Sequence, residues 1–380
     1  MLYGLQRYVN MQRMFPRHSN RQYRNVVTLL AIAIMHLATP VFADQKPRSI
    51  KVVVAGMYEL GEARGDAPGE IQFWVERLHL DTQLPFPMGE SDLYLNDEGV
   101  MAIVLGGGIP NAAASVMALG LDPRFDLSKT YWLIAGVAGG DPADLSLGSA
   151  AWARHVVDGD LLYEIDAREI PEHWPYGLIP LGAQEPAQRP EDIYTGWTLD
   201  TISFSLNSAL VDWAYSITRD LDLGDSAGIA ERRKLYTEHE RARRPPFVAI
   251  GDSLSSSTYW HGKLLNRWAN DWVKLYAGPK ANFMTTNMED SGTMTALTRL
   301  ARTNRVDLDR VLVLRTASNY TLPPPGKTAA WSRTVPYADN GLPALESAFL
   351  VGNTVVQALL ADWSRYRNHP PGALAAEKSE

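Results

Sequence analysis

Three short apolar segments, each followed at once by glycine, constrain the fold of this chain most. They are residues 49–55, 99–105 and 130–135, followed by Gly56, Gly106 and Gly136. Runs of this length that are rich in Val and Ile are typical of buried strands. Between the second and third runs, residues 110–119 predict a helix, with Pro110 in its first turn and Gly120 at its end. A strand, a glycine turn, a helix and another strand in succession indicate a layered α/β fold.

The rest of the chain continues this pattern. Further strands are predicted at 247–250 and 310–314, and further helices at 199–220, 226–243, up to Tyr276, 291–302 and 342–360. The stretch 171–190 is rich in Pro and Gly and indicates a surface excursion. No internal repeat and no clear linker divides the sequence. We therefore predict one α/β domain over residues 44–380, with a surface insertion around 160–200.

The N-terminus predicts a secretory signal peptide, residues 1–43, cleaved after Ala43. This segment holds five arginines and no acidic residue, then an apolar run at 26–38 and small residues before Asp44. Basic, apolar and small-residue regions in that order are typical of such signals. The alternatives are an uncleaved anchor or a core helix, but about thirteen apolar residues are too few to span a bilayer comfortably. We therefore expect a periplasmic or secreted protein.

Charge and composition exclude several classes of function. Loss of the five arginines takes the formal net charge from −7 to −12, and an acidic surface repels nucleic acid and anionic membranes. No run of eighteen apolar residues follows Ala43, so no stable transmembrane segment is expected after cleavage. The chain has no cysteine, and no His, Asp or Glu group shows metal-ligand spacing. We predict neither a metal nor a cofactor.

Four segments, taken in order, carry a resemblance to a known family. They are Gly56–Glu59, Gly136–Gly140, Asn287–Gly292 and Arg315–Asn319. Their order resembles that of the motifs of the nucleoside phosphorylase/nucleosidase superfamily. The amino-acid sequence of residues 251–261 and 287–292 is similar to that of its purine nucleoside permease branch. The resemblance implies a three-layer, phosphorylase-like fold with a central mixed β-sheet flanked by helices. It also implies a purine nucleoside ligand, such as inosine, adenosine or guanosine.

The resemblance assigns roles to particular residues. Met288 and Glu289 would bind the ribose, since a carboxylate accepts hydrogen bonds from two adjacent hydroxyls; the alternative for Glu289 is a solvated acid at a helix N-terminus. The residues implied for the purine are Ser253, Leu254, Ser255, Tyr259, Trp260, Ser318 and Asn319. Many relatives carry an acid at the position of Asn319, which cannot donate a catalytic proton. That departure suggests a 6-oxopurine preference or slower cleavage, unless Asn319 only caps a turn.

The same resemblance bears on the reaction type. Gly56, Gly136, Val137 and Arg315 would form the loop region that faces the nucleophile or anion, but the arginines that hold phosphate in phosphorylases have no counterpart there, and the offset of Arg64 is wrong. The nucleosidase branch uses a glutamate of the first loop to activate water. Glu59 or Glu62 is the candidate here, with an exposed loop acid as the alternative. We expect hydrolysis rather than phosphorolysis.

Two other functions remain as alternatives. A non-catalytic purine nucleoside-binding protein could assist transport by passing its ligand to a separate membrane transporter. The segment Gly251–Leu254 also spells the motif of GDSL esterases, with Ser253 as nucleophile. Its position late in the chain and the absence of a following Asp-x-x-His pair argue against an esterase. A homo-oligomer is possible, because superfamily members are commonly oligomeric.

Overall fold

The computed structural model describes residues 46–193 and 200–372. Contacts between residues divide the chain into two units, Met1–Lys46 and Pro47–Glu380. The described helices and strands all belong to the second unit. The predicted signal peptide at 1–43 lies outside the described residues.

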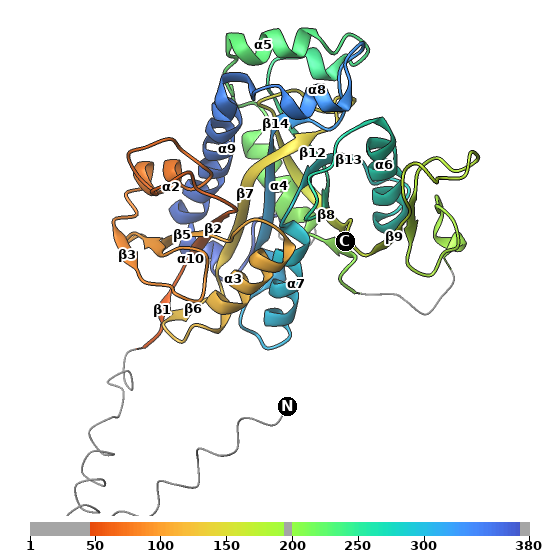
Figure 1. Ribbon diagram of the computed structural model, residues 1–380. Helices are drawn as coiled ribbons and strands as arrows, with labels where there is room; N and C mark the ends of the chain where they lie inside the picture. Colours follow the sequence, from red (N-terminus) through yellow and green to blue (C-terminus); the bar gives the residue numbers. More distant parts are fainter. Residues whose placement is uncertain (1–45, 194–199, 373–380) are drawn as a thin grey trace, which may run out of the picture. The chain divides into compact units, whose positions relative to one another are not determined.

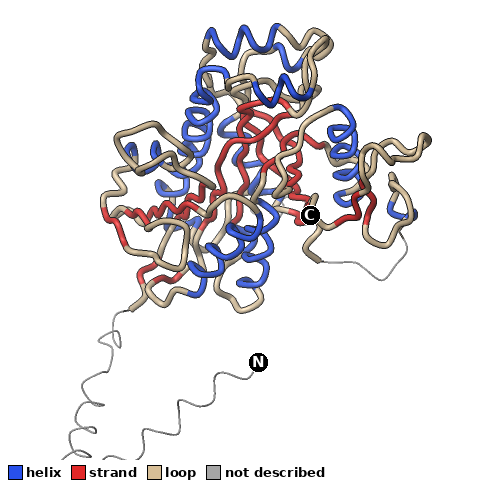
Figure 2. Tube along the Cα trace, in the orientation of Figure 1, coloured by secondary structure: helices blue, strands red, loops and turns tan. Residues whose placement is uncertain are grey.

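One large mixed sheet forms the centre of this unit (Figures 1 and 2). Its path runs β11-β8-β12-β13-β7-β2-β5-β4-β3, and β14 pairs with both β7 and β8. Strands β2, β5, β7 and β14 run parallel, whereas β13 is antiparallel to β7. The bounds are β2 Val52–Gly56, β3 Thr82–Leu84, β4 Leu93–Leu95, β5 Val100–Val104, β7 Tyr131–Gly140, β8 Ala150–Asp158, β11 Ser203–Ser205, β12 Val248–Ser255, β13 Phe283–Asn287 and β14 Val311–Tyr320.

Part of this sheet closes on itself. Strand β7 pairs with β14, β14 with β8, β8 with β12, β12 with β13, and β13 returns to β7. This closure is possible because β7 is ten residues long: it pairs with β2 over residues 131–134 and with β13 only at Gly139 and Gly140, while β14 pairs along almost its whole length. Two small sheets lie outside it: β1 (Arg48–Ser49) with β6 (Phe125–Asp126), and β9 (Leu162–Glu164) with β10 (Leu178–Pro180).

Helices pack against the sheet in groups. Helix α9 contacts β7 and β14 as well as α2 and α4, while α3 packs on α7 and α6 packs on β12 and β13. The bounds are α2 Gln72–Arg77, α3 Ile109–Leu121, α4 Ser208–Thr218, α5 Ala227–Lys234, α6 Lys263–Ala277, α7 Asp290–Ala301, α8 Ala329–Thr334, α9 Leu342–Ala361 and α10 Trp363–Tyr366; short 3₁₀ turns are η1 Pro190–Asp192, η2 Arg241–Arg243, η3 Leu308–Arg310 and η4 Ala338–Gly341. The predicted mixed sheet flanked by helices is confirmed.

Several element boundaries differ from the sequence prediction. The strand predicted at 247–250 continues to Ser255 through residues expected to form a polar loop, because β8 and β13 pair with it on both sides. The helix predicted from 199 begins only at Ser208, where Asn207 caps it through two backbone N–H groups. Strands β8 and β13 were not predicted, since Arg154 and His155 interrupt the apolar residues of β8, and β13 continues from Phe283 and Met284 into Thr and Asn.

The region predicted as an insertion, 160–200, contains β9, β10 and η1, and its residues 194–199 lie outside the described part. Within the described residues, one helical stretch, Ala338–Ala361, has the length and apolar composition needed to cross a membrane, and half of its most apolar window is buried in the fold. It contains α9, whose buried residues pack on the central strands.

Candidate active site

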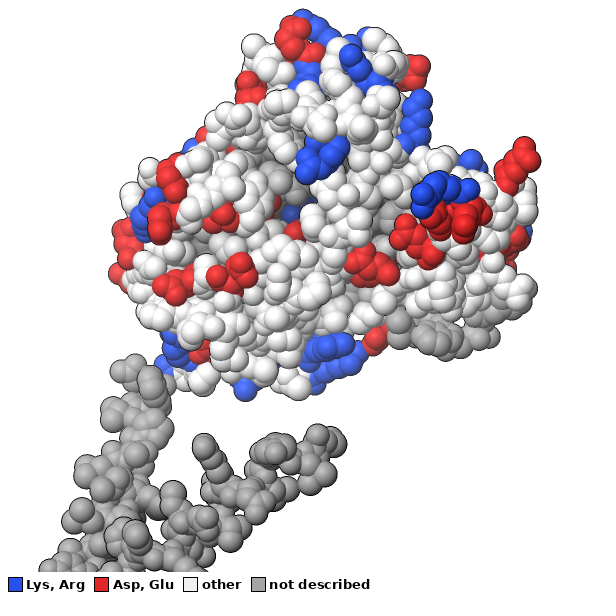
Figure 3. Space-filling model, viewed as in Figure 1, with Lys and Arg blue, Asp and Glu red and all other residues white. Residues whose placement is uncertain are grey.

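A cavity of about 340 Å³ opens where several strands end. The parallel strands β2, β7 and β14 contribute their carboxyl-terminal ends or the residues that follow, which is where α/β folds commonly bind ligands. Figure 3 shows that one face of the molecule is hollowed near its centre, with mainly uncharged residues around the hollow. The lining residues are Met57, Tyr58, Leu60, Pro68, Glu70, Val137, Ala138, Gly139, Tyr259, Thr286, Asn287, Met288, Glu289, Ser318, Asn319, Tyr337, Asn340, Gly341 and Leu345.

Glu70 is the acid that the structure brings into the cavity from the first loop. Its carboxylate accepts hydrogen bonds from the backbone N–H groups of Met57 and Val137, each at 2.6 Å, and the residue is 5% exposed. Gly136 makes this approach possible, because a Cβ there would lie 2.5 Å from a Glu70 oxygen. Burial raises the pKa of Glu70 to about 7, against the opposing effect of Arg315.

Arg315 lies beneath the acids and is 1% exposed. Its guanidinium is paired with Asp290, including Nε contacts of 3.2 Å to both carboxylate oxygens, and Nη1 donates to the Val137 carbonyl at 3.2 Å. Its Nη2 also lies 3.8 Å from Glu289 Oε2. A buried arginine with these partners balances the negative charge around it and is not free to bind an external anion.

Glu289 follows β13 and immediately precedes α7. Its Oε2 accepts from the Met288 N–H at 3.0 Å, and its Oε1 accepts from the Gly108 N–H at 3.3 Å, at the start of α3. Burial raises the pKa of Glu289, and Arg315 opposes that shift. We call Glu70, Glu289, Asp290 and Arg315 the acidic cluster. Two of its carboxylates line the cavity while a single buried cation supports them.

A second group of cavity residues is uncharged. Strand β14 has a bulge between Ala317 and Asn319, so that Ser318 has no partner residue on β7. Neighbouring strand residues normally face opposite sides, and the bulge allows Ser318 and Asn319 to line the same cavity. Tyr259 and Tyr337 line it beside them. We call Tyr259, Ser318, Asn319 and Tyr337 the amide–tyrosine cluster.

The two acids predicted for catalysis do not line the cavity. Glu59 uses its carboxylate to accept hydrogen bonds from the backbone N–H groups of Leu60, Gly69, Ile71 and Gln72, which fixes the loop and the start of α2. Glu62 is exposed. Arg64 binds the Leu80 carbonyl and Asp81, away from the cavity. The loop after β2 continues to the start of α2 at Gln72, and its far end brings Glu70 rather than the nearer acids back to the strand ends.

The residues predicted for the purine divide into two groups. Tyr259, Ser318 and Asn319 line the cavity, as do Met288 and Glu289 from the predicted ribose pair. Trp260 lines only a small neighbouring pocket and packs on Trp268 and Phe283. Ser253, Leu254 and Ser255 are fully buried in β12 and do not line the cavity.

The buried serines have structural partners instead. Ser253 donates to Asp290 and accepts from Asn287, and Ser255 accepts from the Ser291 N–H. Ser253 therefore supports the residue that pairs with Arg315. This arrangement leaves Ser253 buried and without a histidine partner among the described contacts, which does not favour the esterase alternative.

The residues with polar side chains that line or support the cavity and that sequence reasoning missed include Tyr58, Glu70, Asp290 and Tyr337. The position of Glu70 could have been recognised from the sequence. Glu70 follows Pro68-Gly69 and directly precedes the apolar pattern of α2, and acidic residues are common at the start of a helix. No sequence pattern indicated Tyr337, because it reaches the cavity from the segment between α8 and α9. Over the described residues, no group of three or more His, Asp or Glu side chains could hold a metal ion.

Comparison with known proteins gives a family for this chain. Residues 49–371 match the family described as purine nucleoside permease. A purine nucleoside permease of Candida albicans is 33% identical over 271 residues, which cover 70% of this chain and 65% of that protein. A probable purine nucleoside permease of Schizosaccharomyces pombe is 35% identical over 228 residues, 58% of this chain and 64% of that protein. The match thus spans about 65% of the length of these curated relatives.

Solved structures give weaker similarities. A 5′-methylthioadenosine/S-adenosylhomocysteine nucleosidase of Helicobacter pylori aligns with 82% of this chain and 100% of its own, at 14% identity and a TM-score of 0.49. Futalosine hydrolase of the same organism aligns with 82% of this chain and 98% of its own, also at 14% identity and a TM-score of 0.49. The sequence match over residues 49–371 covers most of the chain, and the chain therefore belongs to the purine nucleoside permease family.

Proposed function

We propose that this protein binds a purine nucleoside in the cavity at the strand ends and hydrolyses its N-glycosidic bond. The observation that carries the proposal is the joint presence of Glu70, Glu289 and Asn319 on the wall of one cavity. A carboxylate suits a ribose diol, an amide suits a heterocyclic base, and a second carboxylate suits a water molecule. The permease names of the relatives and the nucleoside they imply support this ligand class.

Glu70 is the group that we assign to water activation. Both of its oxygens are fixed by backbone N–H groups, so the carboxylate is held in place before the substrate arrives. A base works best when its pKa lies near the working pH, and the pKa of Glu70 is about 7. As the water oxygen bonds to C1′ of the ribose, Glu70 takes the water proton and the C1′–N9 electron pair leaves with the purine.

The charge of the cavity supports hydrolysis over phosphorolysis. None of the described lining residues is Lys, Arg or His, whereas phosphate binding normally uses several cationic or N–H donors. Arg315 is nearby but is buried and already paired with Asp290. A phosphate dianion bound in the cavity would also lie near the carboxylates of Glu70 and Glu289, and these negative charges would repel it.

Binding without cleavage is the second candidate, and Asn319 is the observation that favours it. An asparagine cannot protonate the departing purine, so the base must take its proton from water or leave with more negative charge. Such a protein would bind the nucleoside and release it to a separate membrane transporter. We also propose, from the N-terminal sequence alone, that the mature protein works in the periplasm or outside the cell.

One assay on the purified mature chain separates these functions. Adenosine, inosine and guanosine are incubated with the protein in phosphate-free buffer, and free base and ribose are measured by chromatography. Release of both products supports hydrolysis. Cleavage only after phosphate is added, with ribose 1-phosphate as product, contradicts it. Saturable binding without any product shows the carrier function instead, and absence of binding removes the nucleoside assignment.

A further inference from the structure

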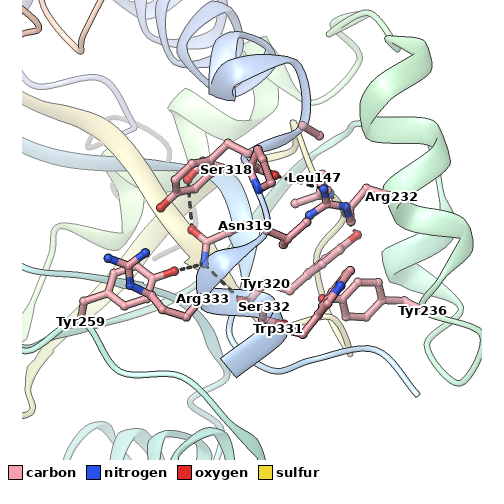
Figure 4. A pocket seen from close by; sticks show the side chains of 14 residues that line it. Leu147, Arg232, Tyr236, Tyr259, Ser318, Asn319, Tyr320, Trp331, Ser332 and Arg333 are labelled. Carbon is pink, nitrogen blue, oxygen red and sulfur yellow. Dashed lines mark hydrogen bonds between the residues drawn. The ribbon is translucent and has the colours of Figure 1, made fainter. Parts of the chain in front are cut away.

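The hydrogen bonds of Asn319 restrict what its side chain offers to a ligand. Its Nδ2 donates to the Tyr320 carbonyl at 3.1 Å and to the Tyr259 hydroxyl at 3.0 Å (Figure 4). An amide nitrogen has two hydrogens, and both are used by these bonds. Rotating the amide by 180° would place Oδ1 against the Tyr320 carbonyl, which can only accept. The protein itself therefore fixes the orientation, and the group left for a ligand is Oδ1.

Tyr259 holds the second Nδ2 hydrogen of Asn319. Its hydroxyl accepts that hydrogen at 3.0 Å, and burial together with the nearby Tyr337 raises the pKa of Tyr259, so the hydroxyl stays neutral. The Asn319 amide nitrogen is thereby left without a free hydrogen for a ligand.

Ser318 also offers a hydrogen-bond acceptor to the cavity, and we call Ser318 and the Asn319 Oδ1 atom together the acceptor wall. Its hydroxyl lies 3.2 Å from Asn319 Oδ1 and 3.4 Å from the Ala138 carbonyl, and both of these partners are acceptors. Its one hydrogen is therefore directed to a protein acceptor, which leaves lone pairs for the cavity. Figure 4 shows Ser318 beside the Asn319 amide, with Tyr259 on the other side of that amide. Ser318 and Asn319 both present acceptors to a bound base.

We propose that this wall selects 6-aminopurine nucleosides over 6-oxopurine nucleosides, an inference that rests on the nucleoside-binding function proposed above. The 6-amino group of adenine is a hydrogen-bond donor and matches two acceptors. The 6-carbonyl of hypoxanthine or guanine is an acceptor and would leave acceptors facing each other without a hydrogen. A buried polar group without a partner is costly, and sites built to pair with a ligand donor discriminate strongly against its absence.

This inference differs from what the residue type alone suggests. An asparagine can donate to a 6-carbonyl, and the sequence accordingly indicated a 6-oxopurine preference as one possibility. The two protein acceptors around Nδ2, Tyr320 O and Tyr259 Oη, remove that option. Specificity then depends on Tyr259 as much as on Asn319, because Tyr259 is the acceptor that a substitution can remove.

Dissociation constants test the inference independently of turnover. We would measure Kd by calorimetry for adenosine, purine riboside, which has no 6-substituent, and inosine, using Glu70→Gln protein so that ligand is not consumed. The expected order of affinity is adenosine, then purine riboside, then inosine, with at least about a tenfold gap between the first and last. Equal or tighter binding of inosine with clear adenosine binding overturns the selectivity but leaves the nucleoside function standing. No binding of any of the three overturns both.

Two variants test whether the hydrogen bond between Asn319 and Tyr259 causes the selectivity. Tyr259→Phe frees one Nδ2 hydrogen for a 6-carbonyl, so the ratio of inosine Kd to adenosine Kd should fall severalfold. Tyr163→Phe, at an exposed tyrosine of β9 that does not line the cavity, should retain the wild-type ratio. An unchanged ratio in Tyr259→Phe contradicts the acceptor-wall explanation, and so does an equal fall in both variants. Circular dichroism and thermal unfolding of both variants establish that each remains folded.

Discussion

The acidic cluster and the amide–tyrosine cluster line one cavity but are built from different chemistry. The acidic cluster places Glu70 and Glu289 on a buried Arg315–Asp290 pair, and every carboxylate in it is held by backbone N–H groups or by the guanidinium. The amide–tyrosine cluster contains only neutral side chains, which bond mainly to one another and to carbonyls.

The difference has an energetic meaning. Charged groups in a buried site interact strongly, so a change there should be expressed in rate and stability. Neutral hydrogen bonds contribute about 1 kcal/mol each and can be exchanged with little net loss. The acidic cluster thus suits bond cleavage and ribose binding, and the amide–tyrosine cluster suits discrimination between bases. Substitutions in the two clusters should separate these contributions.

The largest effect is expected for Glu70→Gln. The variant keeps the shape of the side chain but cannot accept a proton from water, so kcat for adenosine hydrolysis should fall by roughly 10²- to 10⁴-fold. Initial rates over a range of substrate concentrations provide the measurement. Glu98→Gln is the matched control, since Glu98 is exposed on the loop before β5. A greater loss of kcat in Glu59→Gln than in Glu70→Gln would return the catalytic role to the acid predicted from sequence.

The next effect concerns stability and pH. Glu70 has a folded-state pKa of about 7 against an ordinary value of 4.5, so the folded state binds its proton more tightly than the unfolded state does. The free energy of unfolding therefore falls as pH rises from about 4.5 through 7, by about 3 kcal/mol in total. The Glu70→Gln variant has no titrating group at this position, so its free energy of unfolding does not decrease for this reason. The free energy of unfolding of the variant minus that of wild type should therefore increase between pH 5 and pH 8.

Chemical denaturation at pH 5, 6, 7 and 8 gives the difference directly, because other titrating groups are common to both proteins. Glu98→Gln should show a nearly constant difference from wild type over this range. A constant difference for Glu70→Gln as well would mean that Arg315 holds Glu70 ionised throughout, and the assignment of a base with a pKa near neutrality would then fail.

A smaller effect is expected for Glu289→Gln. An amide retains one acceptor but loses the charge, and a hydrogen bond to a charged group contributes about 1.5–3 kcal/mol. The Kd of adenosine should rise by roughly 10- to 100-fold. In wild-type protein 2′-deoxyadenosine should bind more weakly than adenosine, and this difference in Kd should shrink in the variant, because the missing 2′-hydroxyl is one that we assign to Glu289. An undiminished difference would mean that another residue binds the 2′-hydroxyl.

The sequence allowed a good prediction of the fold, and some of the residues that it assigned to a site lie together on the wall of one cavity. The glycine-terminated strands β2, β5 and β7 were readable because buried parallel strands are continuous apolar runs. Strands β8 and β13 were not, since they contain small and polar residues whose strand conformation depends on pairing with distant neighbours.

The candidate site shows the same division. Glu289 and Asn319 lie at strand ends, and the family resemblance predicted that they would meet at one ligand; both line the cavity. Glu70 lies at the end of a long loop whose path is fixed by tertiary hydrogen bonds, including those of Glu59. The choice between these two acids required coordinates. The bulge that brings Ser318 to the cavity likewise depends on pairing with β7, which no local pattern specifies.

The smallest effect should come from the neutral cluster, with Ser318→Ala. The serine contributes a neutral hydroxyl, and losing one such hydrogen bond changes binding by about 0.5–1.5 kcal/mol, which is roughly a two- to tenfold rise in the Kd of adenosine. The bulge in β14 is a backbone feature, so alanine can occupy it without loss of the fold. Calorimetric titration of the variant beside Ser128→Ala, which lies outside the cavity, gives the comparison. A rise above about a hundredfold would mean that Ser318 binds a charged or protonated atom of the base, and the neutral character assigned to this end of the site would then be replaced by one resembling the acidic cluster.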